Sequence, residues 1–281
     1  MAYQGRRAGK KKNDGTLLGI LGLVGTILIV AVVFLCIGRR APARETPTTP
    51  PTLPPPAENP YAERDFTTDE NGYIHCDGAL SGIDVSEHQR EINWAAVKEA
   101  GMDFAIVRVG YRGYDSGGIH ADSHAADNLK GAAEQGMKVG AYFFSQAISP
   151  EEAVEEAEFV IKMLKNYEIT APVFFDWEPV SNSEARTADM TGRLLTDCAQ
   201  AFCQTISQAG YTAGVYFNQY QAQEMYRLRE MTEDTFWLAM YEDAMTFPYA
   251  MQFWQYSCEG TVPGIDTTVD LNLWFGAAKG E

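Results

Sequence analysis

Two carboxylates, Asp176 and Glu178, lie two positions apart at the end of the apolar run APVFFDWEP, residues 171–179. Successive side chains of a β-strand point to opposite faces, so these two would share a face, with Cα atoms roughly 6.5 Å apart. Glycoside hydrolysis needs such a pair, because one acid protonates the leaving oxygen while a second group stabilises the developing positive charge. The alternative is a surface turn with two solvated acids, or one acid capping a helix, because carboxylates are usually exposed.

Two further acids are expected at strand ends. Asp84 lies in GIDVS, residues 82–86, at the end of the first predicted strand, and Asp270 lies in VDLN, residues 269–272, at the end of the last. The first and last strands of a closed barrel are neighbours, so both acids would face the Asp176/Glu178 pair across the axis. Four converging carboxylates repel one another, which raises at least one pKa and supplies a protonated acid near neutral pH.

The segment that starts near residue 79 repeats a unit in which a helical pattern ends at a glycine and a short apolar strand follows. Three such helices are predicted, over residues 93–100, 125–135 and 189–209. The strands that follow them are predicted over residues 104–109, 139–144 and 213–217. The glycine after each helix favours the left-handed conformation that stops it.

A fourth helix is predicted to begin at Ser149, which is followed by Pro150 and Glu152. Serine is favoured as an N-cap, proline suits the first turn, and a glutamate three positions after the serine completes a capping box. This helix runs towards Tyr167 and leads into the strand that carries Asp176. Later strands are predicted over residues 236–241, 251–256 and 268–272, with little helix between them.

Alternating strands and helices predict a parallel sheet. Roughly 200 residues with about eight strands favour an α/β fold, an irregular TIM-like β/α barrel, over an open sheet. Chemistry in such barrels collects at the carboxyl ends of the strands. Side chains expected at those ends are Asp84, Arg108, Tyr142, Asp176, Glu178, Tyr216, Asn218, Tyr241, Tyr256 and Asp270. A packed core would not tolerate these polar groups unpaired, so a polar cleft is predicted.

Charge is distributed unevenly along the 281 residues, whose formal net charge is −16. Residues 1–44 carry a net charge of +7, and the remaining residues carry −23. An acidic body argues against nucleic-acid binding, which requires a basic surface.

The N-terminal segment has the pattern of a membrane anchor. Residues 16–37 carry no charge and would span about 33 Å as a helix, enough to cross a bilayer core. Five basic residues precede this run and three follow it, which places the N-terminus in the cytoplasm. A cleaved signal peptide is the alternative, but its apolar region is shorter and ends at small residues.

Four regions are therefore predicted along the chain. They are a basic cytoplasmic tail at 1–15, a single transmembrane anchor at 16–38, a Pro/Thr-rich and acidic linker at 39–78, and a barrel outside the cell membrane at 79–281. Eight prolines between residues 41 and 60 indicate an extended, semi-rigid spacer.

Cysteine and histidine give little support for other chemistries. The sequence has no CxxC pair, and Cys76 and Cys258 could either pair in an exported domain or remain free thiols. His120 and His124 have i, i+4 spacing, but their surroundings are loop-like and no third ligand is apparent, so neither a metal nor a cofactor is expected. No nucleophile elbow or phosphate-binding glycine loop occurs.

The order of these motifs resembles the family 25 glycoside hydrolases, muramidases sometimes called Chalaropsis-type lysozymes. The resemblance covers most of residues 79–281. Its matching stretches are GIDVS at 82–86, INW at 92–94, FAIVRVGY at 104–111, VGAYFFS at 139–145, DWE at 176–178, WQY at 254–256, GID at 264–266 and VDLN at 269–272.

The resemblance implies an irregular β/α barrel that hydrolyses the β-1,4 bond between N-acetylmuramic acid and N-acetylglucosamine in peptidoglycan. Glu178 matches the proton donor, and Asp176 matches the partner that orients the substrate's N-acetyl group as an internal nucleophile. Asp84 and Asp270 match the other acids of the cleft. Side chains expected to contact the sugar are Tyr142, Tyr216, Tyr241, Trp254, Tyr256 and Arg108. The expected partners are glycan strands and, through the anchor, the membrane, with a monomeric catalytic domain.

Two segments depart from the family pattern. Residues 108–112, RVGYR, stand where many members have lysine and a Ser/Thr-Glu-Gly segment, and Arg90 stands where glycine often follows glutamine. Neither departure affects the four acids. The alternatives are a carbohydrate-binding or scaffold protein on a catalytically retired barrel, another glycosidase, or a metal-dependent deacetylase that uses His120 and His124.

Overall fold

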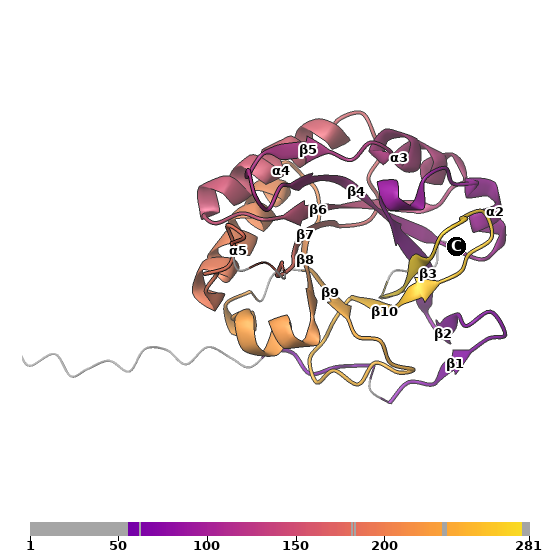
Figure 1. Ribbon diagram of the computed structural model, residues 1–281. Coiled ribbons are helices and arrows are strands. Elements are labelled where there is room, and N and C mark those ends of the chain that lie inside the picture. The colour runs from indigo at the N-terminus through magenta and orange to yellow at the C-terminus, as the bar shows by residue number, and fades with distance from the viewer. Residues whose placement is uncertain (1–55, 62, 181, 183, 232–234, 277–281) are drawn as a thin grey trace, which may run out of the picture. The chain divides into compact units, whose positions relative to one another are not determined.

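The apolar runs predicted as strands form a closed ring (Figure 1). The computed structural model describes residues 56–276 except 62, 181, 183 and 232–234. Within these residues eight strands make the ring, because the first pairs with both the second and the last. They are β3 (Ala79–Val85), β4 (Phe104–Arg112), β6 (Lys138–Ser145), β7 (Val173–Trp177), β8 (Ala213–Asn218), β9 (Thr235–Ala239), β10 (Phe253–Gly260) and β11 (Val269–Phe275). The predicted β/α barrel is confirmed.

Helices cover the outside of the first half of the ring (Figure 1). They are α2 (Trp94–Glu99), α3 (Ala125–Glu134), α4 (Pro150–Leu164) and α5 (Gly192–Gln208). The three glycines predicted to end helices, Gly101, Gly136 and Gly210, all have positive φ, as a left-handed C-terminal turn requires. After β8 the described segments contain only short turns of helix, η2 (Gln221–Met225) and η3 (Leu228–Glu230).

The cap of α4 differs in detail from the predicted capping box. Ser149 accepts a hydrogen bond from the Glu152 amide, as expected. The Glu152 carboxylate, however, accepts from the amide of Ile148 rather than that of Ser149. It also binds the Arg186 guanidinium through both oxygens, at 2.7 Å each, so the N-terminus of α4 is tied to the loop that follows β7.

The last strand, β11, runs antiparallel to both of its neighbours. Only a short connection separates it from β10. A parallel neighbour would need a longer crossover, so the chain returns in the opposite direction. Asp270 therefore lies at the beginning of β11, which corrects the prediction that it ends the last strand. The reversal brings it to the rim where the parallel strands end, directly opposite Asp84 of β3.

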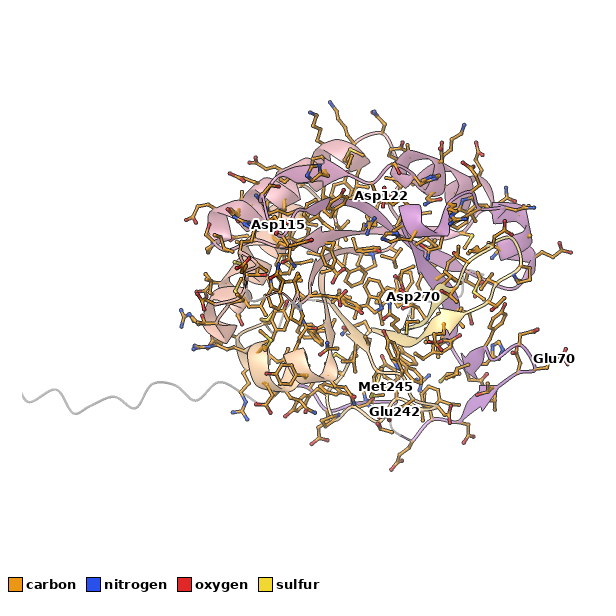
Figure 2. All side chains as sticks on the ribbon, in the orientation of Figure 1. Glu70, Asp115, Asp122, Glu242, Met245 and Asp270 are labelled. Carbon is orange, nitrogen blue, oxygen red and sulfur yellow. The ribbon has the colours of Figure 1, made fainter. Side chains whose placement is uncertain are left out.

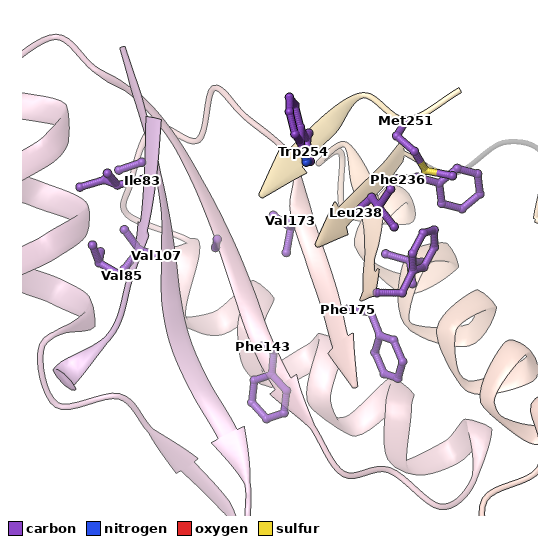
Figure 3. Packing of buried hydrophobic residues seen from close by; sticks show 14 of the residues in the cluster. Ile83, Val85, Val107, Phe143, Val173, Phe175, Phe236, Leu238, Met251 and Trp254 are labelled. Carbon is purple, nitrogen blue, oxygen red and sulfur yellow. The ribbon is translucent and has the colours of Figure 1, made fainter. Parts of the chain in front are cut away.

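Apolar side chains fill two layers. An inner cluster lies inside the ring and includes Phe104, Phe174, Trp237 and Phe253. A larger outer cluster lies between the strands and the covering elements, and Figure 3 shows part of it. Each strand contributes to both layers by alternation, since Phe174 belongs to the inner cluster and Phe175 to the outer.

The folded unit begins before Ala79, which corrects the predicted boundary between linker and barrel. A hairpin of β1 (Phe66–Thr68) and β2 (Ile74–Cys76) precedes β3, and its Ile74 is buried. The ring of Phe66 lies edge-on to Trp254 at 5.4 Å between centroids. Tyr61 stacks on Phe275 at 4.1 Å, and the Asn59 amide donates to two backbone carbonyls, those of residues 245 and 247.

Two other expectations concern the N-terminal part and the cysteines. Nowhere in the described residues is there a helix with the length and apolar character that crossing a membrane requires. The anchor expected at 16–38 lies outside those residues. Cys76 is buried, Cys258 is exposed, and no disulfide joins them.

The hairpin makes a prediction about stability. A chain that begins at residue 56 should be more stable than one that begins at Ala79, because the shorter chain loses the buried Tyr73 and Ile74. At about 1.5–3 kcal/mol for each large side chain, the difference in the free energy of unfolding should be about 3–6 kcal/mol. Urea denaturation of the two chains measures it, and equal midpoints would show that the hairpin is dispensable.

Candidate active site

The four predicted acids surround one cavity at the rim where the parallel strands end, and Figure 2 labels Asp270 within the ring. This acidic cavity has a volume of about 210 Å³. Its lining consists of Asp84, Ser86, His88, Gln89, Arg108, Tyr142, Phe144, Asp176, Glu178, Tyr216, Trp237, Gln255 and Asp270. The strand alternation explains the inward direction of Asp176, because Phe174, two positions earlier, points into the inner cluster.

Asp84 and Asp270 form a hydrogen-bonded pair across β3 and β11. Two amides also donate to the Oδ2 atom of Asp84, Asn272 Nδ2 at 2.8 Å and Gln255 Nε2 at 2.9 Å. The Gln255 amide lies 3.4 Å from Asp270 Oδ2 as well. The donors concentrate on Asp84, so Asp84 is the better-stabilised anion of the pair.

The proton of this pair belongs on Asp270. Burial, the charge of Asp84 and the hydrogen bond to Asp84 raise the pKa of Asp270 to about 9. Burial also raises the pKa of Asp84, but its hydrogen bonds to Asn272, Gln255 and Asp270 counteract that increase. At neutral pH Asp270 therefore stays protonated, and the pair does not carry two negative charges.

Two tyrosines and a tryptophan orient the amides that hold this pair. Both Tyr216 and Tyr241 donate their hydroxyls to Oε1 of Gln255, at 3.0 and 3.1 Å. With its oxygen occupied, the Gln255 amide turns its nitrogen towards the acids. Trp237 Nε1 donates to Oδ1 of Asn272 at 2.8 Å, so the nitrogen of that amide faces Asp84.

Asp176 and Glu178 differ in burial and in their surroundings. Burial first, and then the neighbouring charge of Glu178, raises the pKa of Asp176 well above its ordinary value. Its Oδ1 atom is buried and has no hydrogen-bond partner among the described residues. Glu178 is half-buried, and burial together with the charge of Asp84 raises its pKa. The cavity can therefore hold a protonated carboxyl near neutral pH.

The backbone that carries Glu178 is held by two buried glutamines. Strand β7 ends at Trp177, whose carbonyl accepts a hydrogen bond from Gln221 Nε2 at 2.6 Å. The next carbonyl, that of Glu178, accepts from Gln146 Nε2 at 2.9 Å. Thr187 in turn donates to Oε1 of Gln146 at 2.8 Å. Both glutamines are fully buried, so their position is set by these bonds.

Arg108 lines the cavity but is already paired. Its Nε donates to Asp122 at 2.8 Å and its Nη2 to Glu87 at 3.2 Å. Its guanidinium carbon lies 5.4 Å from the centre of the Tyr111 ring. The positive charge lowers the pKa of Asp176, although less than burial raises it.

Three of the six residues predicted to contact sugar line the cavity, a fourth contacts one of its lining residues, and two lie elsewhere. Tyr142, Tyr216 and Arg108 line it, and Tyr241 reaches it through Gln255. Trp254 and Tyr256 point away from it into the outer cluster, which corrects the prediction for both (Figure 3 shows Trp254). They alternate with Gln255, and only one side of β10 faces the cavity.

Several lining residues were missed by reasoning from the sequence. Gln255 and Asn272 bind the acids, and Trp237 and His88 line the cavity. A signal for Gln255 was present, since a glutamine flanked by two aromatic residues in a strand is the polar exception to a buried pattern.

The histidines considered as metal ligands lie apart from the four acids. His120 stacks on Tyr111 at 5.1 Å between centroids, and His124 precedes α3. Within the described residues, no three His, Cys, Asp or Glu side chains are grouped as a metal site would require.

Comparison with known proteins gives consistent matches. The model of glycosyl hydrolases family 25 matches residues 83–265. Lysozyme M1 from Streptomyces globisporus is 26% identical over 211 residues, which cover 71% of this chain and 69% of that protein.

Solved structures agree with the family match. The modular autolysin LytC from Streptococcus pneumoniae, in complex with a synthetic peptidoglycan ligand, superposes with a TM-score of 0.62 at 27% identity. That match covers 75% of this chain and 52% of LytC, so the chain spans about half the length of the autolysin. The bacterial lysozyme from Streptomyces coelicolor gives a TM-score of 0.59 at 25% identity, over 71% of this chain and 93% of that structure.

The protonated pair makes a prediction about pH. Asp270 has its ordinary pKa of 3.8 when unfolded, so between about pH 4 and pH 9 the folded protein holds the extra proton. Its contribution to the free energy of unfolding therefore falls as pH rises through this window. The variant Asp270→Asn removes this contribution and keeps a donor for Asp84, so we expect it to raise Tm more at pH 8 than at pH 5.

Thermal unfolding of the variant and the unmodified protein at both pH values measures the effect. Asp243→Asn, which changes an exposed acid, is the matched control. A Tm shift of the same size at both pH values would mean that Asp270 is not the residue that holds the proton.

Proposed function

The chain belongs to the glycosyl hydrolases of family 25, and from this premise we propose that it hydrolyses peptidoglycan as a muramidase. The bond cut is the β-1,4 bond between N-acetylmuramic acid and N-acetylglucosamine. The observation that carries the proposal is Glu178, a half-buried acid with a raised pKa in a cavity that holds three more carboxyls.

Glu178 serves as the proton donor. Its pKa is raised by burial and by the charge of Asp84, which favours the protonated form that a proton donor needs. The proton passes to the oxygen of the leaving sugar as the glycosidic C–O bond breaks. The hydrogen bond from Gln146 to the Glu178 carbonyl supports this role, because it fixes the backbone from which the acid extends.

Asp176 orients the substrate's N-acetyl group. The amide N–H of that group would supply the donor that Asp176 Oδ1 lacks. The acetyl oxygen attacks the anomeric carbon as the bond to the leaving sugar breaks, and a cyclic oxazolinium ion forms. Water then opens this ring and returns a proton to Glu178, so the enzyme regains its starting state.

Asp84 and Asp270 regulate the charge around the reacting groups. After burial, the charge of Asp84 raises the pKa of Glu178, and the same charge stabilises positive charge that develops on the substrate. A second negative charge on the Asp84/Asp270 pair would oppose the ionisation of Asp176. The shared proton therefore lets one anion serve the reaction while the total charge stays low.

We also propose that residues 16–38 anchor the chain in the cell membrane, with the N-terminus in the cytoplasm and the barrel outside. Support comes from the uncharged run at 16–37 and the basic residues before it. Protease added to intact cells that carry the full chain should then release the barrel. A barrel that is degraded only after the cells are lysed would contradict this orientation.

The catalytic proposal is tested by Glu178→Gln in the full chain. We expect the kcat/KM for purified peptidoglycan to fall by about 10²–10⁴-fold, because general acid catalysis is lost. The matched control is Glu158→Gln, which changes an exposed glutamate on α4. Mass spectrometry of the released muropeptides identifies the bond, because the sugar at the new reducing end should be N-acetylmuramic acid.

Two results would contradict the proposal. Full activity in Glu178→Gln would exclude Glu178 as the donor. Binding of glycan strands by the unmodified protein without any turnover would indicate a carbohydrate-binding barrel instead of an enzyme.

A further inference from the structure

Arg186 lies in the segment that leads from Glu178 to α5, eight positions after the proton donor. Its guanidinium binds both oxygens of Glu152 at 2.7 Å each, and its Nη1 atom also donates to the backbone carbonyl of Gln146 at 2.9 Å. Its own amide donates to the Tyr114 carbonyl at 3.2 Å. Arg186 thus joins the segment after β7 to the segments after β4 and β6 and to the first turn of α4.

The ion pair between Arg186 and Glu152 has a fixed geometry. The two side chains are mostly buried, with exposed fractions of 17% and 23%. Two hydrogen bonds between one guanidinium and one carboxylate set the direction of both groups. The hydrogen bonds from Arg186 lower the pKa of Glu152, so this carboxylate is charged at neutral pH. Gly117 lies against the guanidinium, where a Cβ atom would come within 2.8 Å of it and displace it.

Residues 186 and 187 hold Gln146 at two points. The Arg186 guanidinium binds its backbone carbonyl, and Thr187 donates its hydroxyl to the side-chain Oε1 at 2.8 Å. With that oxygen occupied, the Gln146 amide directs Nε2 to the backbone carbonyl of Glu178 at 2.9 Å. Gln146 and Thr187 are buried, so each bond lost would leave a polar group unpaired. The backbone of the proton donor therefore depends on Arg186 through one intermediate side chain.

Arg186 acts at a distance from the reacting atoms. The described residues that line the acidic cavity do not include it. After burial, the charge that raises the pKa of Glu178 is that of Asp84. The charge of Arg186 is balanced by Glu152. Its effect on the reaction is therefore expected to be geometric, through the position of the donor.

We propose that Arg186 is a positioning residue for proton transfer by Glu178. It acts through Gln146, and its pair with Glu152 fixes the guanidinium in place. This inference rests on the proposed function, because it takes Glu178 to be the proton donor. A misplacement of about 1 Å in a reacting group can lower a rate about 10²-fold, so a remote contact of this kind can control kcat.

The first test compares Arg186→Met with the unmodified full chain on soluble glycan strands. Methionine keeps a long side chain but cannot donate. We expect kcat to fall about 10- to 100-fold while KM stays within about twofold, because only the position of the donor changes. Arg186→Lys keeps the charge and provides a milder variant if Arg186→Met fails to fold. Its kcat should fall by a smaller factor, because an ammonium cannot reproduce the planar fork of the guanidinium.

The matched control is Arg193→Met, which breaks an exposed ion pair with Asp197 on α5 and should leave both constants unchanged. A double-mutant cycle tests the pairing. Glu152→Gln should lower kcat as Arg186→Met does, and the double variant should be no worse than either, because the two residues act as a unit. Losses that multiply would overturn the proposed pairing.

A titration separates this inference from the proposed function. NMR of isotope-labelled glutamate side chains follows the pKa of Glu178, with Glu178→Gln used to assign its signal. In Arg186→Met we expect this pKa to fall towards its ordinary value of 4.5, because a carboxyl that is no longer held in the cavity gains contact with water. This comparison holds even if the unmodified chain shows no turnover, which would overturn the proposed function alone. A lower Tm with unchanged kcat and an unchanged pKa of Glu178 would overturn the inference, since Arg186 would then only stabilise the fold.

Discussion

The carboxyl groups at the centre of the barrel can lie this close together only because protons and amide donors keep their negative charges from accumulating. Asp84 receives two amide hydrogen bonds and a third from Asp270, whose own pKa is raised to about 9. Tyr216 and Tyr241 orient the Gln255 amide that serves both acids. Asp84, Asp270 and the amides and hydroxyls around them thus form a connected network, and such networks are strong only when their members are satisfied.

Closure of the ring brings this network together. Asp84 and Asp270 are separated by nearly the whole length of the folded unit, yet they pair in register because β11 turns back between β10 and β3. A parallel final strand would carry its first residues to the opposite end of the barrel, away from Glu178. The reversal of β11, the one strand of the eight described in the ring that runs against the others, is therefore a requirement of the site, and the short connection before it is sufficient to produce it.

Sequence reasoning identified the barrel, the helix ends and the four acids, because glycine, apolar runs and carboxylates carry strong local signals. It misplaced Trp254 and Tyr256 because β10 is buried on both sides. Such a strand is apolar on both faces and lacks the alternation that would distinguish inside from outside. The direction of the strand that carries Asp270 and the packing of the polar hairpin before Ala79 likewise depend on tertiary contacts, which local patterns do not encode.

The position of Glu178 explains why two glutamines are buried beside it. Glu178 lies one residue beyond β7, where neighbouring strands no longer supply ladder hydrogen bonds. The side chains of Gln221 and Gln146 take over, binding the carbonyls of residues 177 and 178 in turn. Loss of either amide would leave a buried carbonyl unpaired, at a cost of about 1–3 kcal/mol. The proton donor can thus extend past the strand into the cavity while side-chain hydrogen bonds hold its backbone.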